Sequence, residues 1–153
     1  ATSAEVNRTS DISARVVTTT ATALTLSVTE HAERVVLVNT NSTVANTLTL
    51  PAASGTGAKF TIINGIAQTQ GSIVVAANGT DVFVGGVHIS DTTAETAMGF
   101  LTSATSDKYT FNLTTMGGLK ADKFEAWDVA ANTWQVQITA FGSGTLATGF
   151  AAT

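Results

Sequence analysis

The fold of this chain is decided by two neighbouring segments, Phe124-Glu125-Ala126-Trp127-Asp128-Val129 and Trp134-Gln135-Val136-Gln137-Ile138. Both contain aromatic and β-branched residues, and the second alternates apolar and polar side chains, as a strand with one buried face does. The connection between them, residues 130–133, includes Asn132 and is short enough for a tight turn. The two segments are therefore predicted to form one antiparallel β-hairpin.

The same pattern recurs on the N-terminal side of this hairpin. Short apolar or alternating segments, separated by Gly, Asn, Ser and Pro, are found at residues 24–28, 35–38, 47–50, 60–63, 73–75, 82–84 and 109–113. Val35 to Val38 is apolar throughout, which favours a strand buried on both faces. Asn78-Gly79 favours a hairpin turn, and Gly85-Gly86 also indicates a turn. A helical turn is expected only at residues 91–98, with Asp91 as its cap.

These segments predict an all-β fold of roughly ten short strands, an antiparallel β-sandwich or jelly-roll-like barrel. A chain of 153 residues fits one domain. Residues 1–12 are polar and unpatterned, so we expect an N-terminal arm there, followed by a single β-sandwich domain over residues 13–153. The Gly-rich tail from Phe141 to Leu146 is expected to run out of the body. Neither a secretory signal nor a membrane span is predicted, because the N-terminus lacks a basic region before an apolar stretch and no apolar run approaches ~18 residues.

The composition indicates that part of the apolar surface is shared. The chain has 29 Thr and 24 Ala, 44% hydrophobic residues and only 12% charged residues, against ~25% charged in average soluble proteins. Its mean hydropathy is +0.26, which favours subunits or a partner covering an apolar face. A net charge of −4 argues against nucleic-acid binding. The absence of Cys excludes disulfides, zinc–thiolate sites and a thiol nucleophile.

No catalytic constellation is predicted from the histidines. His31 and His88 are 57 positions apart, and a Ser–His–Asp arrangement requires a nucleophile and a carboxylate beside one of them. Ser90 and Asp91 are near His88 only in sequence. Surface or interface histidines are therefore the preferred interpretation.

The carboxylates also favour structural roles. Each aspartate stands beside turn residues, where Asp side chains accept backbone hydrogen bonds; this holds for Asp81, Asp91, Asp107, Asp122 and Asp128. A metal site at Asp81 or Asp122 is an alternative, but no metal-ligand spacing supports it. Glu30, Glu33 and Glu125 form no recognisable pair across a cleft. We predict no catalytic residue, no metal and no cofactor.

Trp127 and Trp134 flank the predicted hairpin turn. The preferred interpretation is a cross-strand aromatic pair that fills one end of the core. The alternatives are a sugar-stacking platform, as in carbohydrate-binding modules, and a subunit interface. Four Asn-x-Ser/Thr sequons, at Asn7, Asn41, Asn78 and Asn112, are expected by coincidence in a Thr-rich chain.

Two regions resemble a recurring pattern in virion proteins of tailed bacteriophages. The first is Leu48-Thr49-Leu50-Pro51-Ala52-Ala53-Ser54-Gly55-Thr56-Gly57-Ala58-Lys59-Phe60-Thr61, followed by Gly71-Ser72-Ile73-Val74-Val75 and Gly79-Thr80-Asp81-Val82. The second is Gly117-Gly118-Leu119-Lys120-Ala121-Asp122, then Trp134-Gln135-Val136 and Gly142-Ser143-Gly144-Thr145-Leu146-Ala147-Thr148-Gly149-Phe150. The similarity, over about residues 46–150, is to the capsid decoration (cement) and head-fibre proteins. Relatives commonly have Gly-Asp where this chain has Ala121-Asp122, and Pro where it has Gly149.

The resemblance implies a small β-sandwich that forms a homotrimer on the outer capsid surface and performs no chemistry. The expected partners are further copies of the chain and the major capsid protein, in a particle assembled in the host cytoplasm. By analogy, Glu5, Val6, Asn7 and Arg8 are expected to face the capsid. One alternative function is a tail-fibre or adhesin-type glycan-binding module that uses Trp127 and Trp134. Another is a small jelly-roll hydrolase or lyase.

Overall fold

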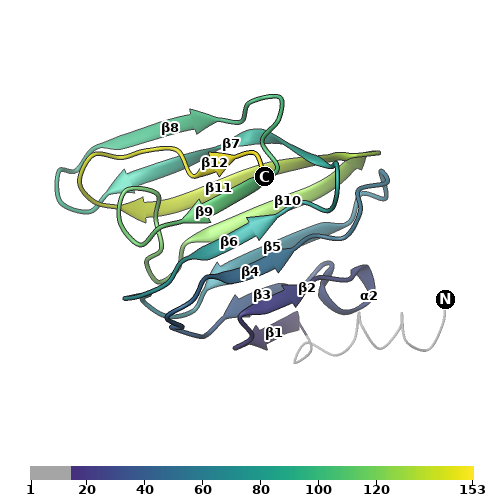
Figure 1. Ribbon diagram of the computed structural model, residues 1–153, viewed down its shortest axis with the longest axis horizontal. Helices are drawn as coiled ribbons and strands as arrows, with labels where there is room; N and C mark the ends of the chain where they lie inside the picture. Colours follow the sequence, from purple (N-terminus) through teal and green to yellow (C-terminus); the bar gives the residue numbers. More distant parts are fainter. Residues whose placement is uncertain (1–14) are drawn as a thin grey trace.

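The structure is a computed structural model in which residues 15–153 are described, so the expected arm and its residues Glu5, Val6, Asn7 and Arg8 lie outside the described part. Within residues 15–153 the fold is nearly all-β, with one short helix and strands in two sheets (Figure 1). The elements are β1 (Val16–Thr19), β2 (Ala23–Thr25), α2 (Val28–His31), β3 (Val35–Val38), β4 (Asn46–Thr49), β5 (Lys59–Asn64), β6 (Ile73–Ala76), β7 (Val82–Asp91), β8 (Ala97–Leu101), β9 (Lys108–Phe111), β10 (Lys123–Ala130), β11 (Thr133–Gly142) and β12 (Phe150–Ala151).

The first half of the chain winds back and forth between the two sheets. The seven-stranded sheet has the order β1-β3-β5-β10-β11-β7-β8, and the five-stranded sheet has the order β12-β9-β6-β4-β2. Strands β1, β3 and β5 enter the first sheet in turn, with β2, β4 and β6 in the second sheet between and after them. Each strand therefore returns to its own sheet running in the same direction, and the four pairings among these strands are parallel.

The predicted antiparallel arrangement is wrong for half of the strand pairings. Five of the ten pairings are antiparallel, and β11 with β7 adds a fifth parallel one. Half-buried strands alternate with the same period of two whether their neighbours run parallel or antiparallel. The residue pattern therefore predicts strands without predicting their relative direction.

The hairpin predicted from the opening segments is confirmed as β10 and β11. Phe124 lies opposite Ile138, and Ala126 lies opposite Val136. Asn132 has a φ of 57° in the turn, a backbone conformation that Asn tolerates better than most residues. The hairpin fits between β5 and β7 and so completes the seven-stranded sheet.

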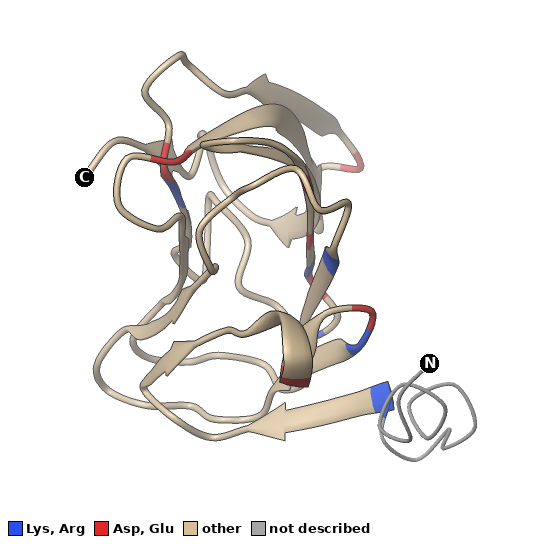
Figure 2. Cartoon of the chain, turned by 90° about the vertical axis from the view of Figure 1, so that its right-hand side faces the viewer, with Lys and Arg blue, Asp and Glu red and all other residues tan. Residues whose placement is uncertain are grey.

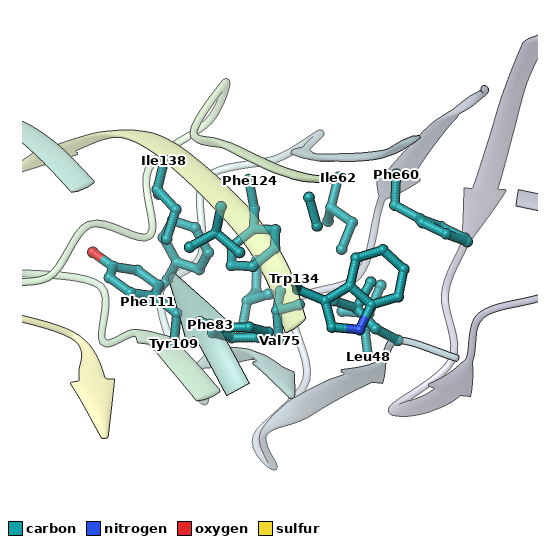
Figure 3. Close-up of a cluster of buried hydrophobic side chains, with 14 of the residues drawn as sticks. Leu48, Phe60, Ile62, Val75, Phe83, Tyr109, Phe111, Phe124, Trp134 and Ile138 are labelled. Atoms are coloured by element: carbon teal, nitrogen blue, oxygen red, sulfur yellow. The ribbon is translucent and has the colours of Figure 1, made fainter. Parts of the chain in front are cut away.

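One hydrophobic core lies between the sheets (Figure 3). Its largest side chains are fully buried aromatic rings, from Trp134, Tyr109, Phe60, Phe83 and Phe124. The rings of Phe60 and Trp134 meet edge-on with centroids 5.5 Å apart. Burial of each such side chain contributes about 1.5–3 kcal/mol to stability.

Two local predictions about helix are wrong. The expected strand over residues 24–28 ends at Thr25 and gives way to α2, which Ser27 caps by accepting a hydrogen bond from the Glu30 backbone N–H. Residues 91–98 contain no helix; they comprise the end of β7, the turn over residues 92–96 and the start of β8. Asp91 still acts as a cap there, because its Oδ1 accepts from the backbone N–H groups of Thr93 and Ala94.

Strand boundaries and connections account for the remaining differences. β3 buries one face only, since Val36 and Val38 are buried and the residues between them are partly exposed. Asn78-Gly79 turns the chain from one sheet to the other, so it does not form a hairpin. Gly85-Gly86 lies inside β7.

The C-terminal tail returns to the body of the protein. Leu146 is buried, and β12 pairs with β9 at the edge of the five-stranded sheet. The ring of Phe150 lies 5.0 Å from that of Tyr109, centroid to centroid. The expectation that the Gly-rich tail leaves the body is therefore wrong, because Leu146 and Phe150 supply the apolar contacts that hold it.

Candidate functional site

The outward face of the seven-stranded sheet carries most of the features that point to an interaction. Strand register aligns its side chains in rows across the sheet. In one row Lys59 of β5 lies opposite Trp127 of β10, Trp127 lies opposite Gln135 of β11, and Gln135 is paired with Val84 of β7. Lys59 on β5 is the only charged residue in this row, and the residues on β10, β11 and β7 are uncharged.

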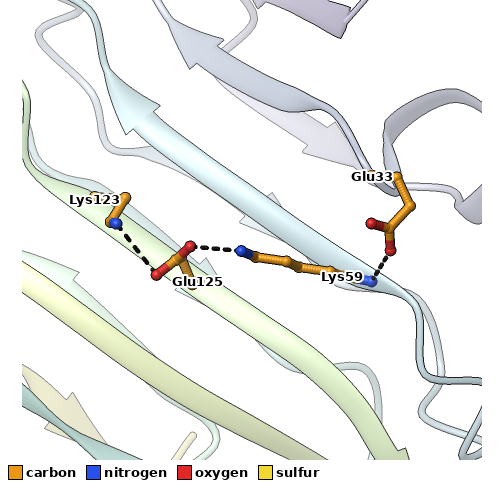
Figure 4. Close-up of polar contacts among 4 residues, drawn as sticks. All are labelled: Glu33, Lys59, Lys123 and Glu125. Carbon is orange, nitrogen blue, oxygen red and sulfur yellow. Dashed lines mark hydrogen bonds and ion pairs between the residues drawn. The ribbon is translucent and has the colours of Figure 1, made fainter.

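The charged part of the face is an ion-pair chain on β5 and β10 (Figure 4). Lys59 Nζ lies 2.8 Å from Glu125 Oε1, and Lys123 Nζ lies 3.3 Å from Glu125 Oε2. Glu33 Oε1 accepts a hydrogen bond from the Lys59 backbone N–H at 2.9 Å. Burial would raise the pKa of Glu125, but hydrogen bonds from Lys59 and Lys123 outweigh it and leave the pKa lowered. These charges satisfy one another and leave little net charge for a partner.

From β11 to β8 the outward face carries no Asp, Glu, Lys or Arg. Its outward residues are Thr133, Gln135, Gln137, Thr139, Phe141, Val82, Val84, Gly86, His88, Ser90, Ala97, Gly99 and Leu101. Leu101 is 83% exposed and Val84 is 53% exposed. Gly86 and Gly99 leave a shallow groove, bordered by Leu101 and His88. We call this region, from β11 to β8, the neutral face. The sparse charges of the chain are seen in Figure 2.

A second feature is an open hollow beside Trp127, at the junction of the charged and neutral parts. It has a volume of about 500 Å³ and is lined by Gly55, Gly57, Trp127, Asp128, Val129, Gln135 and Gln137. Lys59 Nζ lies 4.8 Å from the centroid of the Trp127 ring. Lys59 is absent from the lining of the hollow, so the hollow extends from the ring towards β11.

Asp128 fixes the loop that forms one wall of this hollow. Its carboxylate accepts hydrogen bonds from the backbone N–H groups of Ser54, Gly55 and Thr56 at 2.9, 2.6 and 3.0 Å, and from Thr56 Oγ1 at 2.6 Å. Burial opposes ionisation of Asp128, but these four donors outweigh it and lower its pKa. The carboxylate is therefore fully engaged within the protein and presents no available charge to a ligand.

The two tryptophans do not share a surface. Trp134 is completely buried and lies opposite Asp128, whereas Trp127 points outward opposite Gln135. The register shifts between Asp128 and Ala130. Without that shift Trp127 and Trp134 would project from the same face, because one inserted residue turns every following side chain over. The cross-strand aromatic pair and the two-tryptophan sugar platform are both wrong, and Phe60 is the aromatic partner of Trp134.

The histidines are in separate environments, and the interpretation of both as surface or interface residues is wrong for His31. His31 is buried at the end of α2, where its Nδ1 accepts the Ser27 backbone N–H at 3.0 Å. His88 is exposed on the neutral face. Among residues 15–153, no group of three or more His, Asp or Glu side chains is arranged to hold a metal ion.

The interpretation of the aspartates as caps of their adjoining turns is confirmed for Asp91 and Asp122, whereas Asp81, Asp107 and Asp128 hold backbone that is distant in sequence. Besides Asp91 and Asp128, Asp81 accepts the Ala53 N–H at 2.7 Å and Asp107 accepts the Thr153 N–H at 2.8 Å. Asp122 is also buried, and it joins its own turn to a strand that is 19 residues further along the chain.

Asp122 ties a glycine loop to the end of β11. Its Oδ2 accepts the N–H groups of Gly118 at 2.6 Å and Leu119 at 3.2 Å, and its Oδ1 accepts the Phe141 N–H at 3.0 Å. Burial raises the pKa of Asp122 to about 6, although the same three donors act in the opposite direction. The carboxyl group is thus enclosed and structural, with its hydrogen bonds made inside the protein.

Comparisons of the chain with protein-family models, curated proteins and solved structures find no match. The resemblance to capsid decoration proteins rests on the quoted residues alone. In the part of the chain that the structure describes, no helix is both long and apolar enough to cross a bilayer.

Proposed function

We propose that this chain is a capsid decoration (cement) protein of a tailed phage. In this proposal its two sheets form a jelly-roll-like β-sandwich, and three copies bind together on the outer surface of the head. The observation that carries the proposal is the neutral face, which exposes Leu101 and Val84 on a chain of net charge −4. The sequence resemblance to decoration proteins supports the choice of partner.

The neutral face is suited to contact between identical copies. Acidic subunits repel one another, and the repulsion is smallest where the contacting surface carries no charge. Burial of exposed leucine and valine contributes roughly 25 cal/mol per Å² of apolar area. The face extends over three adjacent strands, so neighbouring copies can dock without separating ion pairs.

The proposed role on the shell is mechanical. A trimer that bridges neighbouring capsid subunits adds contact area that must be broken before the shell opens. Several weak contacts held on one rigid trimer act together, so the overall affinity exceeds that of any single contact. Residues Glu5 to Arg8 are proposed to bind the major capsid protein, with no enzymatic step and no cofactor.

The first test is the solution mass of the full chain by light scattering coupled to size exclusion. Three chains of 15.6 kDa give about 47 kDa. Leu101→Asp places a charge on the neutral face and is expected to yield a folded monomer. Val44→Asp is the matched control, because Val44 is also exposed (56%) but lies in a loop outside that face. A trimer that is unaffected by Leu101→Asp would contradict the proposed interface.

The second test addresses the capsid. Wild-type protein is expected to co-sediment with undecorated phage heads, and a variant that lacks residues 1–12 is expected to remain folded and stay in the supernatant. Undiminished co-sedimentation of the truncated protein would overturn the role of Glu5 to Arg8. Failure of the wild type to bind any undecorated head would count against the function itself.

A further inference from the structure

We propose that the hollow beside Trp127 binds a neutral saccharide, with the indole ring as the stacking surface and Gln135 and Gln137 as hydrogen-bonding groups. The hollow borders the neutral face and shares Gln135 and Gln137 with it, whereas its stacking ring, Trp127, lies on β10 outside that face. It is separate from the proposed capsid contact at the N-terminus. It uses one tryptophan only, since Trp134 lies in the core.

The geometry holds the Trp127 ring in place. Lys59 Nζ lies over the ring at 4.8 Å and is itself fixed by Glu125 at 2.8 Å. The cation is attracted to the ring's π-electrons, so the Trp127 ring is held on its β5 side. The side towards β11 is left to the hollow, whose lining includes both glutamines.

The chemistry of the lining selects against charged ligands. Asp128, the one carboxylate that lines the hollow among residues 15–153, is occupied by four internal hydrogen bonds. The remaining polar groups are carboxamides, each of which both donates and accepts. An aromatic surface flanked by two carboxamides complements a pyranose ring, which presents an apolar C–H face and a rim of hydroxyl groups.

The site is open and its walls are formed in advance. Its volume of about 500 Å³ lies within the range of small-molecule sites. Asp128 holds the loop with Gly55 and Thr56 in place, so little ordering is required when a ligand binds. Because an open site buries less of the ligand than a closed one, we expect a dissociation constant of about 10⁻³ M for one oligosaccharide chain.

The test begins with the full-length protein on a printed array of neutral and acidic glycans. Retention of neutral hexose or N-acetylhexosamine glycans is expected, and the strongest of them is then titrated while tryptophan fluorescence is followed. Emission from Trp127 is expected to change on binding. The buried Trp134 is expected to give no response, so a Trp127→Phe variant loses the signal and keeps a weaker stacking surface.

Matched variants separate stacking from general effects on the fold. Trp127→Ala is expected to weaken binding at least tenfold and Gln137→Ala several-fold, with unchanged circular dichroism. Val84→Ala, on the same sheet but outside the hollow, is expected to bind like the wild type. The proposal is overturned if no neutral glycan is retained, if only acidic glycans are retained, or if Trp127→Ala binds equally well. None of these readouts depends on capsid binding. Because Gln135 and Gln137 also belong to the neutral face, the titration is repeated with Leu101→Asp, which is expected to bind the glycan as well as the wild type does. Loss of binding in that variant would contradict a site centred on Trp127.

Discussion

Two aspartates that perform similar structural work are expected to respond to pH in opposite directions. Asp122 and Asp128 each hold a loop by accepting several backbone N–H groups. Burial dominates at Asp122 and raises its pKa to about 6, whereas the donors dominate at Asp128 and lower its pKa. The sign of each pKa shift determines how the free energy of unfolding changes with pH.

Asp122→Asn is predicted to destabilise the protein by about 2 kcal/mol at pH 4, because the amide nitrogen only donates and cannot replace the carboxyl oxygen that accepts backbone N–H groups at that position. The folded protein holds the Asp122 proton more tightly than the unfolded chain does, with a pKa of about 6 against 3.8. Ionisation of this residue therefore lowers the stability of the wild type as pH rises from about 4 to 6. Urea unfolding at pH 4, 5 and 6.5 should show that the difference in free energy of unfolding between wild type and variant becomes smaller as pH rises. A gap that widens over this range would contradict the raised pKa.

Asp128→Asn is predicted to show the opposite trend. The folded protein holds the Asp128 proton less tightly than the unfolded chain, so the ionised carboxylate stabilises the fold above its unfolded pKa of about 3.8. The variant is expected to lose about 2 kcal/mol near neutral pH, and the loss should shrink as pH falls below about 4. Urea unfolding at pH 3 and pH 6 tests this. Equal losses at both values would show that Asp128 ionisation does not contribute.

The sequence predicts the role of the aspartates but not their protonation. An aspartate beside turn residues indicates a cap of that turn, which is the role of Asp91 and Asp122, whereas Asp81, Asp107 and Asp128 accept from backbone that is distant in sequence. Whether Asp122 is enclosed depends on the Gly118 loop and on Phe141, which is 19 residues away in sequence. Nothing in the neighbourhood of Asp122 in sequence predicts that distant contact.

At the scale of elements, the pairing of β7 with β11 depends on one glycine. Gly85 has a φ of +147°, and a Cβ there would lie 1.9 Å from the Val136 carbonyl oxygen. Gly85→Ala is predicted to lower the free energy of unfolding by on the order of 4 kcal/mol or more, or to prevent folding. Gly79→Ala is the control, because Gly79 has a φ of +56° with no atom within 4 Å of its added Cβ; it should cost about 1 kcal/mol. Thermal unfolding of both variants makes the comparison, and similar losses would contradict the role of Gly85.

Strands were predictable from the sequence where alternation is clear, as at the β10–β11 hairpin and at β5, β6 and β9. The direction in which neighbouring strands pair was less predictable, because side chains alternate with a period of two residues in both parallel and antiparallel strands. The register shift near Val129 carries no sequence signal, yet it decides that Trp127 faces outward while Trp134 is buried. The residues of the candidate saccharide site were therefore only partly identifiable: Trp127 was recognised, and Gln135 and Gln137 were not.

At the scale of the whole molecule, topology explains where the surfaces for partners lie. The N-terminal strands coil through both sheets, and β10 and β11 fit between β5 and β7. This arrangement places the ion-pair chain of Lys59, Lys123 and Glu125 towards one side of the large sheet. The edge strand β8 and its neighbours, on the other side, carry the neutral face. Charge and apolar surface are thus separated across one sheet.

This separation predicts how the proposed trimer responds to salt. An interface held by ion pairs weakens as salt rises, because the Debye length falls to about 3 Å at 1 M ionic strength. An interface on the neutral face has no ion pair to screen, and each copy carries a net charge of −4. Salt then reduces repulsion between copies and leaves the apolar contact in place. The fraction of trimer measured by light scattering should therefore be equal or higher in 1 M NaCl than in 20 mM NaCl. Dissociation in 1 M NaCl would exclude the neutral face as the main contact and would direct attention to the charged strands β5 and β10.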